Sequence, residues 1–195
     1  SGSLRIVGCD VPAQKHDQVD FVFADKVLRF HDPRRFGSIH WTRRDPLRHK
    51  LLHGLGPEPF SDEFCGRYLY DRAASRKLSV KNFIMNSTVV AGVGNIYASE
   101  ALFLSGIHPQ RAAGRIALPR YERLAVNIKE VLRRAIDSGG TTLRDFTREN
   151  GRPGYFAQKL NVYNRQGQPC PRCSHPIQAR VLGQRSSFFC SRCQH

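Results

Sequence analysis

The sequence predicts an α+β protein of more than one domain, with a β-rich N-terminal part, a helical middle and a small β-hairpin at the C-terminus. Three observations support this order. Short segments of alternating apolar residues fill the first 41 positions, and apolar stripes with helical spacing follow between residues 64 and 138. Two pairs of cysteines lie in the last 26 residues. The length of 195 residues and the hydrophobic fraction of 40% are enough to bury a core.

The N-terminal part is predicted to be a sheet without helices. Val19–Phe23 alternates between apolar and polar residues, Lys26–Phe30 follows across a turn, and Ser38–Trp41 is expected as a further strand. The segment Gly54–Phe60 contains two glycines and two prolines, so it is the expected linker to the next domain.

The middle of the chain is predicted to be a helical bundle. Ser61-Asp62-Glu63 is typical of a helix start, and apolar residues at helical spacing follow it. The expected helices cover residues 64–76, 80–85, 96–105 and 119–138. In the last of them the stripe comprises Leu124, Ile128, Val131, Leu132 and Ala135.

The turn between Val89 and Asn95 contains two glycines and leads into the helix expected at Ile96. Asn95 is expected to cap that helix, whose first N–H groups would then face a ligand. Such a corner can hold a phosphate, although most turns of this kind only pack a helix. The polar, Gly/Pro-rich segment Thr141–Tyr155 is expected to be a long functional loop.

The paired cysteines have the spacing of a zinc ribbon. Cys170 and Cys173 are separated by two residues, and so are Cys190 and Cys193, with sixteen residues between the pairs. Four thiolates close a tetrahedral shell around one ion, so the zinc is expected to be structural. The alternative is a pair of disulfides, which a cytosolic chain disfavours. Cys9 and Cys65 are expected to be small buried or half-buried thiols.

The charge predicts a polyanionic partner. The chain carries 31 Lys and Arg against 16 Asp and Glu, a net charge of +15, and no acidic residue follows Gly151. A rigid ribbon with one sign of charge favours nucleic acid binding over a merely solvated face. No apolar run approaches the roughly 18 residues of a membrane span and no leader peptide is evident, so a cytosolic protein is expected.

The segment Asp32–Gly37 places two arginines beside an aromatic residue. Arginines and apolar wedges at a loop tip are what proteins use to unstack a base step and fill the space left by a flipped nucleotide. The alternative is a core position for Phe36 with two surface arginines.

Several motifs together resemble one family, the bacterial formamidopyrimidine-DNA glycosylases. In chain order they are Asp32–Gly37, Leu55–Pro59, Val89–Glu100, Gly106–Pro109, Gly139–Thr142, Gly151–Gln158, Val162–Tyr163 and the two cysteine pairs. The resemblance covers essentially the whole chain. It implies base-excision repair by a glycosylase and abasic-site lyase, which removes 8-oxoguanine and ring-opened purines by base flipping and β,δ-elimination.

The resemblance also implies a domain plan. Residues 1–55 would be the C-terminal part of a β-sandwich domain and 56–63 a linker. Residues 64–158 would be a helix-two-turn-helix domain with a lesion-capping loop at 141–155, and 159–195 a zinc finger. The family's nucleophile is an N-terminal proline, whereas this sequence begins with Ser1, at a point that matches the interior of the family's first domain.

Carried over by position, the resemblance assigns DNA contacts to a set of residues and zinc ligation to the four cysteines. Arg34 and Phe36 would fill the space of the extruded base, Asn95 and Arg185 would hold the flanking phosphates, and Arg185 would also donate the proton for δ-elimination. The other expected DNA-binding residues are His16, Arg76, Lys81 and Tyr163. Lys81 would handle the oxidised base, although a solvated helix lysine is the plainer interpretation.

The expected partner is double-stranded DNA with oxidised bases or abasic sites, bound by a monomer in the bacterial cytosol. Two other functions stay open. One is the related endonuclease that removes oxidised pyrimidines, and the other is a non-catalytic, zinc-dependent DNA-binding fragment.

Overall fold

The computed structural model describes residues 2–138 and 160–195, and the chain forms two compact units. The first contains Ser1–Asp45 and Ser138–Ala157, and the second contains Pro46–Asp137 and Gln158–His195. The loop expected at 141–155 lies outside the described residues. Among the described helices, none is both long and apolar enough to cross a membrane.

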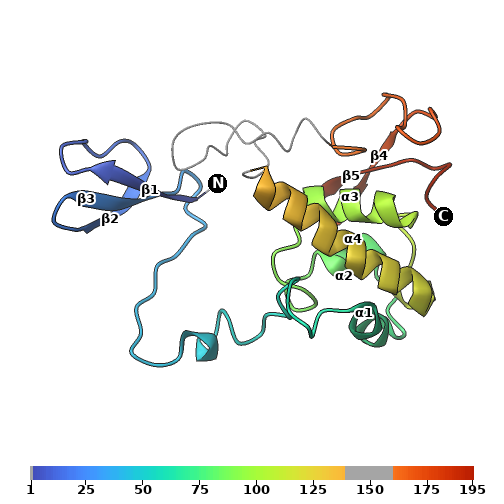
Figure 1. Cartoon of the computed structure of the whole chain (residues 1–195), viewed down its shortest axis with the longest axis horizontal. Coiled ribbons are helices and arrows are strands. Elements are labelled where there is room, and N and C mark those ends of the chain that lie inside the picture. Colours follow the sequence, from blue (N-terminus) through green and yellow to red (C-terminus); the bar gives the residue numbers. More distant parts are fainter. Residues whose placement is uncertain (1, 139–159) are drawn as a thin grey trace. The chain divides into compact units, whose positions relative to one another are not determined.

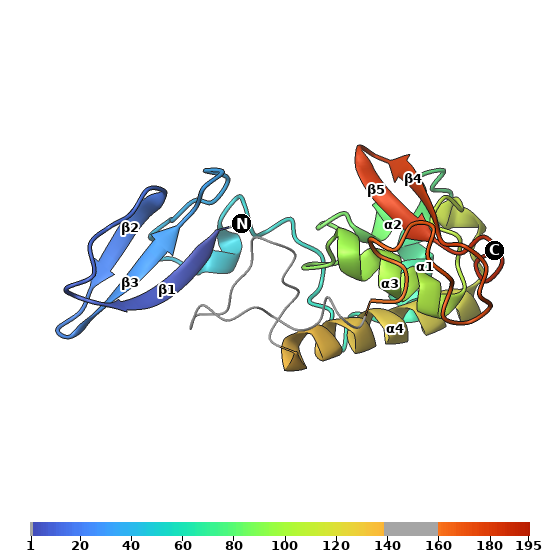
Figure 2. The same cartoon turned by 90° about the horizontal axis from the view of Figure 1, so that it is seen from above.

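The first unit is built on a three-stranded antiparallel sheet. It contains β1 (Ser3–Gly8), β2 (Asp17–Val22) and β3 (Lys26–His31), in the order β1-β3-β2 (Figures 1 and 2). The predicted strands in 19–23 and 26–30 are therefore confirmed.

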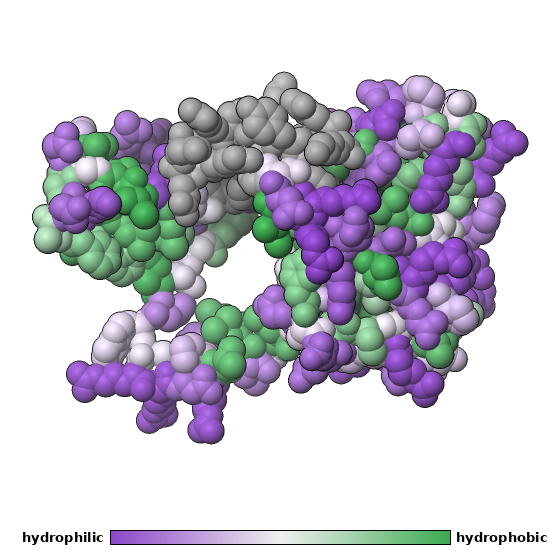
Figure 3. All heavy atoms as spheres, in the orientation of Figure 1, coloured by the Kyte–Doolittle hydropathy of each residue, from purple (hydrophilic) through white to green (hydrophobic). Residues whose placement is uncertain are grey.

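The two faces of this sheet differ in chemistry. Leu4 and Val19 both pair with Phe30, and Ile6 and Phe21 both pair with Leu28, so these apolar residues share one face. Much of that face is exposed: Leu4 and Ile6 keep 51% and 58% of their surface, and Figure 3 shows green side chains over this unit. The opposite face carries the buried Arg29, whose guanidinium donates two hydrogen bonds to Asp20.

The strand expected at Ser38–Trp41 is wrong, because these residues form no regular secondary structure. The Gly37 N–H donates to Oδ2 of the buried Asp32 at 2.6 Å. Trp41 remains 79% exposed, with the Arg43 guanidinium 5.4 Å from its ring centroid.

The second unit is a helical bundle, as predicted. It contains α1 (Gly66–Ala73), α2 (Val80–Ile84), α3 (Asn95–Ser105) and α4 (Leu118–Asp137), with short 3-10 turns at Pro46–Arg48 and Ala113–Arg115. Both α1 and α3 pack against α4 (Figures 1 and 2). The expected stripe of α4 is buried, together with Tyr121 and Ala125.

Helix α1 begins later than the sequence indicates. Its N-cap is Cys65, whose Sγ accepts a hydrogen bond from the Tyr68 N–H at 3.5 Å, and Ser61 instead closes a turn onto the Glu58 carbonyl. The expectation that Cys9 and Cys65 are buried or half-buried is wrong, because both are exposed.

The segment expected as a linker, 56–63, is packed within the second unit. The Gly56 N–H donates to the Ser87 carbonyl at 2.7 Å, and the Ala91 N–H donates to the Pro57 carbonyl at 3.1 Å. A Cβ at Gly56 would lie 2.5 Å from the backbone of Val89, so only glycine allows this approach. The boundary between the two units lies instead between Asp45 and Pro46.

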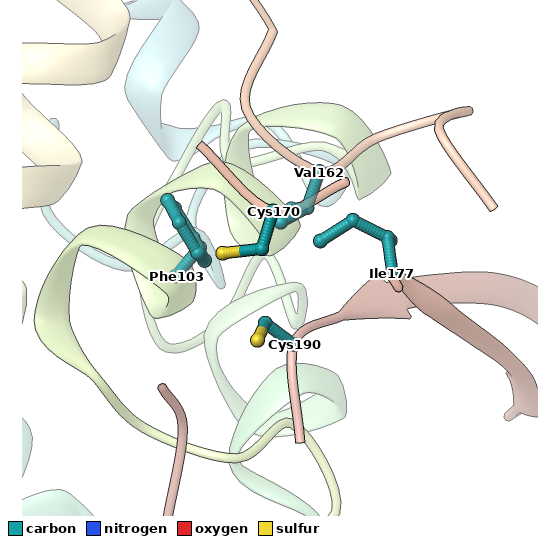
Figure 4. Close-up of a cluster of buried hydrophobic side chains, with 5 residues drawn as sticks. All are labelled: Phe103, Val162, Cys170, Ile177 and Cys190. Atoms are coloured by element: carbon teal, nitrogen blue, oxygen red, sulfur yellow. The ribbon is translucent and has the colours of Figure 1, made fainter. Parts of the chain in front are cut away.

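The C-terminal hairpin consists of β4 (Gln178–Leu182) and β5 (Arg185–Phe189), which pair antiparallel. Gly183 and Gln184 connect them with φ angles of 54° and 62°, as a two-residue hairpin turn requires. The hairpin packs on α3 through a buried cluster, in which the Phe103 ring of α3 faces Cys170 (Figure 4). The cluster contains Phe103, Val162, Cys170, Ile177 and Cys190.

Candidate metal centre and nucleic-acid interface

The four C-terminal cysteines form a metal site. Their Sγ atoms all lie within 4.8 Å of one another, with 3.9 Å between Cys170 and Cys193 and 3.5 Å between Cys173 and Cys190. Tetrahedral zinc with Zn–S bonds of about 2.3 Å requires sulfur atoms about 3.8 Å apart. All four cysteines are free thiols, which excludes the disulfide alternative in this structure. The donor set fits one structural Zn²⁺.

The pKa values of two of these thiols are shifted in opposite directions. A backbone hydrogen bond at His175 lowers the pKa of Cys173 to about 7, whereas burial raises the pKa of Cys193 to about 12. A divalent cation is what allows all four to ionise together. Among the described residues, the cluster contains the four cysteines and neither of the nearby histidines, His175 and His195.

Two similar turns present the sulfur atoms. The N–H of Ser174 donates to the carbonyl of Cys170, and the N–H of Gln194 donates to the carbonyl of Cys190. Gln194 also ties the site to the helical bundle. Its buried side chain accepts a hydrogen bond from the Cys190 N–H and donates one to the carbonyl of Ile107, just after α3.

The N-terminus of α3 lies against the hairpin. The expectation that Asn95 caps this helix is wrong: Asn95 is its first residue, and Gly94 occupies the N-cap position without a side chain to offer. The Asn95 amide points to other elements instead. Its Nδ2 donates to the Ser186 carbonyl at 3.1 Å and to the Tyr163 hydroxyl at 3.4 Å.

The N-terminus of α3 at Asn95, Tyr163 and the hairpin residues Arg185 and Ser186 together form a corner. Lys81 lies beneath it. Its side chain has no exposed surface, so the interpretation as a solvated helix lysine is wrong. The ammonium group donates to Asn95 Oδ1 at 2.5 Å, to Ser187 Oγ at 2.6 Å and to the Ser186 carbonyl at 3.1 Å. Burial, and secondarily the charge of Arg185, lowers the pKa of Lys81 to about 8. The ammonium therefore keeps its proton at neutral pH.

Tyr163 is held in place by a buried carboxylate. Glu100, on α3, is 2% exposed and accepts four hydrogen bonds: one oxygen from the N–H groups of Val162 and Tyr163, the other from the N–H and side chain of Asn161. The Tyr163 ring packs edge-on against Phe188 of β5 at 5.0 Å.

The remaining predicted residues of the second unit are exposed cations. Arg185 begins β5, directly after the hairpin turn and next to Ser186. Arg76 follows α1 behind Ser75, whose φ is 61°, and its backbone carbonyl accepts a hydrogen bond from the Gly114 N–H. The structure thus brings Lys81, Asn95, Tyr163 and the hairpin that carries Arg185 together, whereas Arg76 lies at the end of another helix.

In the first unit, the predicted residues His16, Arg34 and Phe36 lie on two segments that a hydrogen bond joins. The Asp32 N–H donates to the His16 carbonyl at 2.9 Å, which joins the strand-flanking turn of His16 to the loop of Arg34 and Phe36. Phe36 is 83% exposed, so its alternative as a core residue is wrong, and the Arg34 guanidinium lies 5.4 Å from its ring centroid. An exposed aromatic ring beside a guanidinium is a suitable wedge for stacked bases.

Sequence reasoning missed Glu100, Ser186, Ser187 and Gln194. Glu100 carried a detectable signal, because it is the only charged side chain in the apolar helix α3. The other three act through contacts with distant segments, which no local pattern displays.

Two family models match the chain. The helix-two-turn-helix domain of formamidopyrimidine-DNA glycosylase matches residues 55–147, and a zinc finger found in this glycosylase and in isoleucyl-tRNA synthetase matches residues 167–195. The first region contains Lys81 and Asn95 and the second contains Arg185, whereas Tyr163 lies between the two matches.

Curated relatives and solved structures agree with these models. The chain is 59% identical to formamidopyrimidine-DNA glycosylase of Syntrophotalea carbinolica and 56% identical to that of Nitrosococcus oceani, covering all of this chain and 72% of each relative. The MutM (Fpg) protein of Thermus thermophilus superposes with a TM-score of 0.89 at 37% identity, over 99% of this chain and 72% of that one.

Two structures of similar proteins contain DNA. The Lactococcus lactis Fpg with Fapy-dG-containing DNA is 31% identical with a TM-score of 0.88, and MutM with carbocyclic 8-oxo-G-containing DNA is 32% identical with a TM-score of 0.88. Each is matched by 100% of this chain over 71% of its own length. On this evidence, the chain belongs to the formamidopyrimidine-DNA glycosylase family.

Proposed function

We propose that this protein acts in base-excision repair, as a DNA glycosylase and abasic-site lyase for oxidised purines. The observation that carries the proposal is the corner at which the N-terminus of α3, Tyr163 and the zinc-stabilised hairpin meet. It presents amide, hydroxyl and guanidinium donors next to an uncapped helix N-terminus, which is the chemistry that binds phosphates.

The predicted DNA-binding residues other than Lys81 then each have a role. Asn95, Tyr163 and Arg185 bind the phosphates that flank the lesion, and Arg76 and His16 contact the DNA nearby. Arg34 and Phe36 fill the space of the flipped nucleotide. Zinc holds the hairpin rigid, because its four-sulfur shell leaves no position for a substrate.

The proposal divides the chemistry between an N-terminal proline and the described residues of this chain. The family resemblance assigns attack on C1′ to an N-terminal proline, which is not among the 195 residues. The described residues bind DNA, orient the sugar and, through Arg185, donate a proton during δ-elimination. Substrate DNA is double-stranded and contains oxidised bases or abasic sites, the protein acts as a monomer, and its need to reach the chromosome supports the bacterial cytosol as its location.

The test uses the protein as its own host makes it, after N-terminal sequencing and intact-mass measurement. We expect excision of 8-oxoguanine from duplex DNA and a covalent adduct after borohydride reduction of the Schiff base. Binding of damaged duplex without excision or adduct would instead support a non-catalytic DNA-binding protein. Faster excision of thymine glycol than of 8-oxoguanine would support the pyrimidine endonuclease.

The role of Arg185 is tested separately by Arg185→Ala, with Arg180→Ala as the control on the neighbouring strand. Removing the proton donor should leave sugar-terminated β-elimination products, whereas the control should still give phosphate-terminated ends. A denaturing gel separates the two products. Cleavage by Arg185→Ala that matches the unmodified protein would refute this role.

A further inference from the structure

The enclosed ammonium of Lys81 is fully occupied by neighbouring oxygen atoms. A lysine has three N–H donors, and those of Lys81 have three acceptors: Asn95 Oδ1, Ser187 Oγ and the Ser186 carbonyl. A side chain with no exposed surface reaches a DNA base only by giving up these bonds. Direct contact with the oxidised base is therefore disfavoured.

The bond from Lys81 determines how the Asn95 amide is oriented. Because an ammonium only donates, the Asn95 atom that faces it must be the oxygen, and the NH₂ group must face the other way. That NH₂ group donates to Ser186 and to the Tyr163 hydroxyl. The Tyr163 oxygen then serves as an acceptor on its inner side, so its own hydrogen is directed away from Asn95.

The same contacts connect the hairpin to the helical bundle. Two of the three acceptors lie on β5, immediately after Arg185. All three acceptors are neutral oxygen atoms, so these contacts are hydrogen bonds that hold Asn95 and β5 in place.

We infer that Lys81 is a positioning residue for phosphate binding: through the Asn95 amide it orients the hydroxyl donor of Tyr163, and it fixes Ser186 and Ser187 beside Arg185. This inference rests on the proposed function, because it assigns the corner to DNA phosphates. Lys81 acts through its neighbours and touches neither the base nor the phosphate.

The experiment compares two DNA duplexes, one with 8-oxoguanine and one with a tetrahydrofuran abasic-site analogue, which has the phosphates but no base. Lys81→Met should weaken binding to both by about the same factor, on the order of tenfold for the loss of oriented hydrogen bonds. Loss confined to the 8-oxoguanine duplex would overturn the inference in favour of base contact. Lys77→Met removes the same charge from an exposed position nearby and should change binding much less.

A double-mutant cycle tests whether Lys81 acts through Asn95. The Lys81→Met substitution should have little further effect in a protein that already carries Asn95→Ala. Equal effects of Lys81→Met with and without Asn95→Ala would contradict positioning. Zinc content and the circular dichroism spectrum establish that each variant is folded.

A second cycle keeps the inference testable if Lys81→Met does not fold. Ser187→Ala removes one acceptor of Lys81 and leaves every charge in place. It should weaken binding a few-fold on both duplexes, and this effect should disappear in the Asn95→Ala background. An unchanged effect in that background would overturn the inference. The proposed function is tested separately: it fails if the unmodified protein shows no preference for damaged over undamaged duplex. Both cycles can be measured on undamaged DNA, so they do not depend on that result.

Discussion

At the scale of single residues, the site depends on two buried charged side chains, Glu100 and Lys81. The carboxylate only accepts hydrogen bonds and the ammonium only donates them. Glu100 accepts four hydrogen bonds and Lys81 donates three. A buried charge is tolerated only when its hydrogen-bonding capacity is met, and removal of either partner leaves the other unpaired. Each charge fixes a segment that is distant in sequence: 161–163 for Glu100 and 186–187 for Lys81.

Replacing Glu100 tests the first of these. Glu100→Gln turns one acceptor oxygen into an NH₂ group that faces backbone N–H donors. We expect a loss of about 2–3 kcal/mol in the free energy of unfolding, because buried donors are left unsatisfied. Urea denaturation measures it, and Glu122→Gln, at an exposed position of α4, should change it by less than about 0.5 kcal/mol. Equal effects of the two substitutions would refute the role of Glu100.

The depressed pKa of Lys81 predicts a pH dependence of stability. Burial is the main cause that lowers this pKa to about 8. An unfolded lysine has a pKa of about 10.4, so between these values the unfolded chain binds a proton that the folded protein lacks. Stability contributed by this group therefore rises as pH increases through that interval.

Urea midpoints measured between about pH 8 and 10 should show this contribution as the difference between the unmodified protein and Lys81→Met. Lys77→Met, at an exposed position, should keep the pH profile of the unmodified protein. Identical profiles for the unmodified protein and Lys81→Met would contradict the prediction.

At the scale of elements, close packing positions the helices and zinc positions the hairpin. Gly66 opens α1 at the point where the helix meets α4, and a Cβ there would lie 2.3 Å from Cα of Glu122. Because the obstacle is backbone, no change of rotamer relieves it. The hairpin packs on α3 through a cluster that includes two metal-binding cysteines, so its position depends on the ion.

Gly66→Ala separates packing from helix propensity. Alanine favours a helix by up to about 1 kcal/mol, but overpacking costs about 1–3 kcal/mol, and the direct backbone contact makes the second effect larger. We expect net destabilisation, seen as a lower urea midpoint. Gly54→Ala meets nothing within 4 Å and should be nearly neutral. A stabilised Gly66→Ala protein would show that α1 and α4 can separate at little cost.

Zinc removal should act on the hairpin more than on the helices. The cores of α1 and α4 contain no metal ligand, so the helical circular dichroism signal should largely persist after chelation. DNA affinity should fall by about 10- to 100-fold, since in the proposed function the hairpin supplies Arg185 and holds the Asn95 amide, at about 1 kcal/mol for each hydrogen bond lost. Zinc added back should restore it. Unchanged affinity in metal-free protein would refute the placement of the phosphate site beside the hairpin.

At the scale of the whole molecule, the net charge of +15 favours association with DNA. In the proposed function the two units divide the contacts: the first supplies Arg34 and Phe36, and the second supplies the corner formed by Asn95, Tyr163 and the hairpin. Counterion release makes such binding strongly dependent on salt.

Salt titrations distinguish charged from neutral contacts. The logarithm of the association constant should fall linearly with the logarithm of salt concentration, and Arg185→Ala should reduce the slope by about 1. Asn95→Ala should weaken binding without changing the slope, because it removes no charge. A slope that Arg185→Ala leaves unchanged would show that this guanidinium does not contact a phosphate.

Much of this protein could be predicted from local sequence. The zinc ligands follow from cysteine spacing and the four helices from apolar periodicity, because each depends on residues close in the chain. The prediction of a strand at Ser38–Trp41 was wrong because alternation alone does not make a strand. A strand must also pair with another strand, and local sequence does not show whether such a partner is present.

Tertiary structure alone decided how the interface is assembled. Lys81 has the sequence context of a solvated lysine, and only the approach of β5 and Asn95 buries it. Asn95 has the pattern of a cap, yet Gly94 takes that position and frees the amide to bind the hairpin. Residue type and spacing determine which groups are available, whereas burial and long-range hydrogen bonds determine which of them meet, because those energies arise only when distant segments pack together.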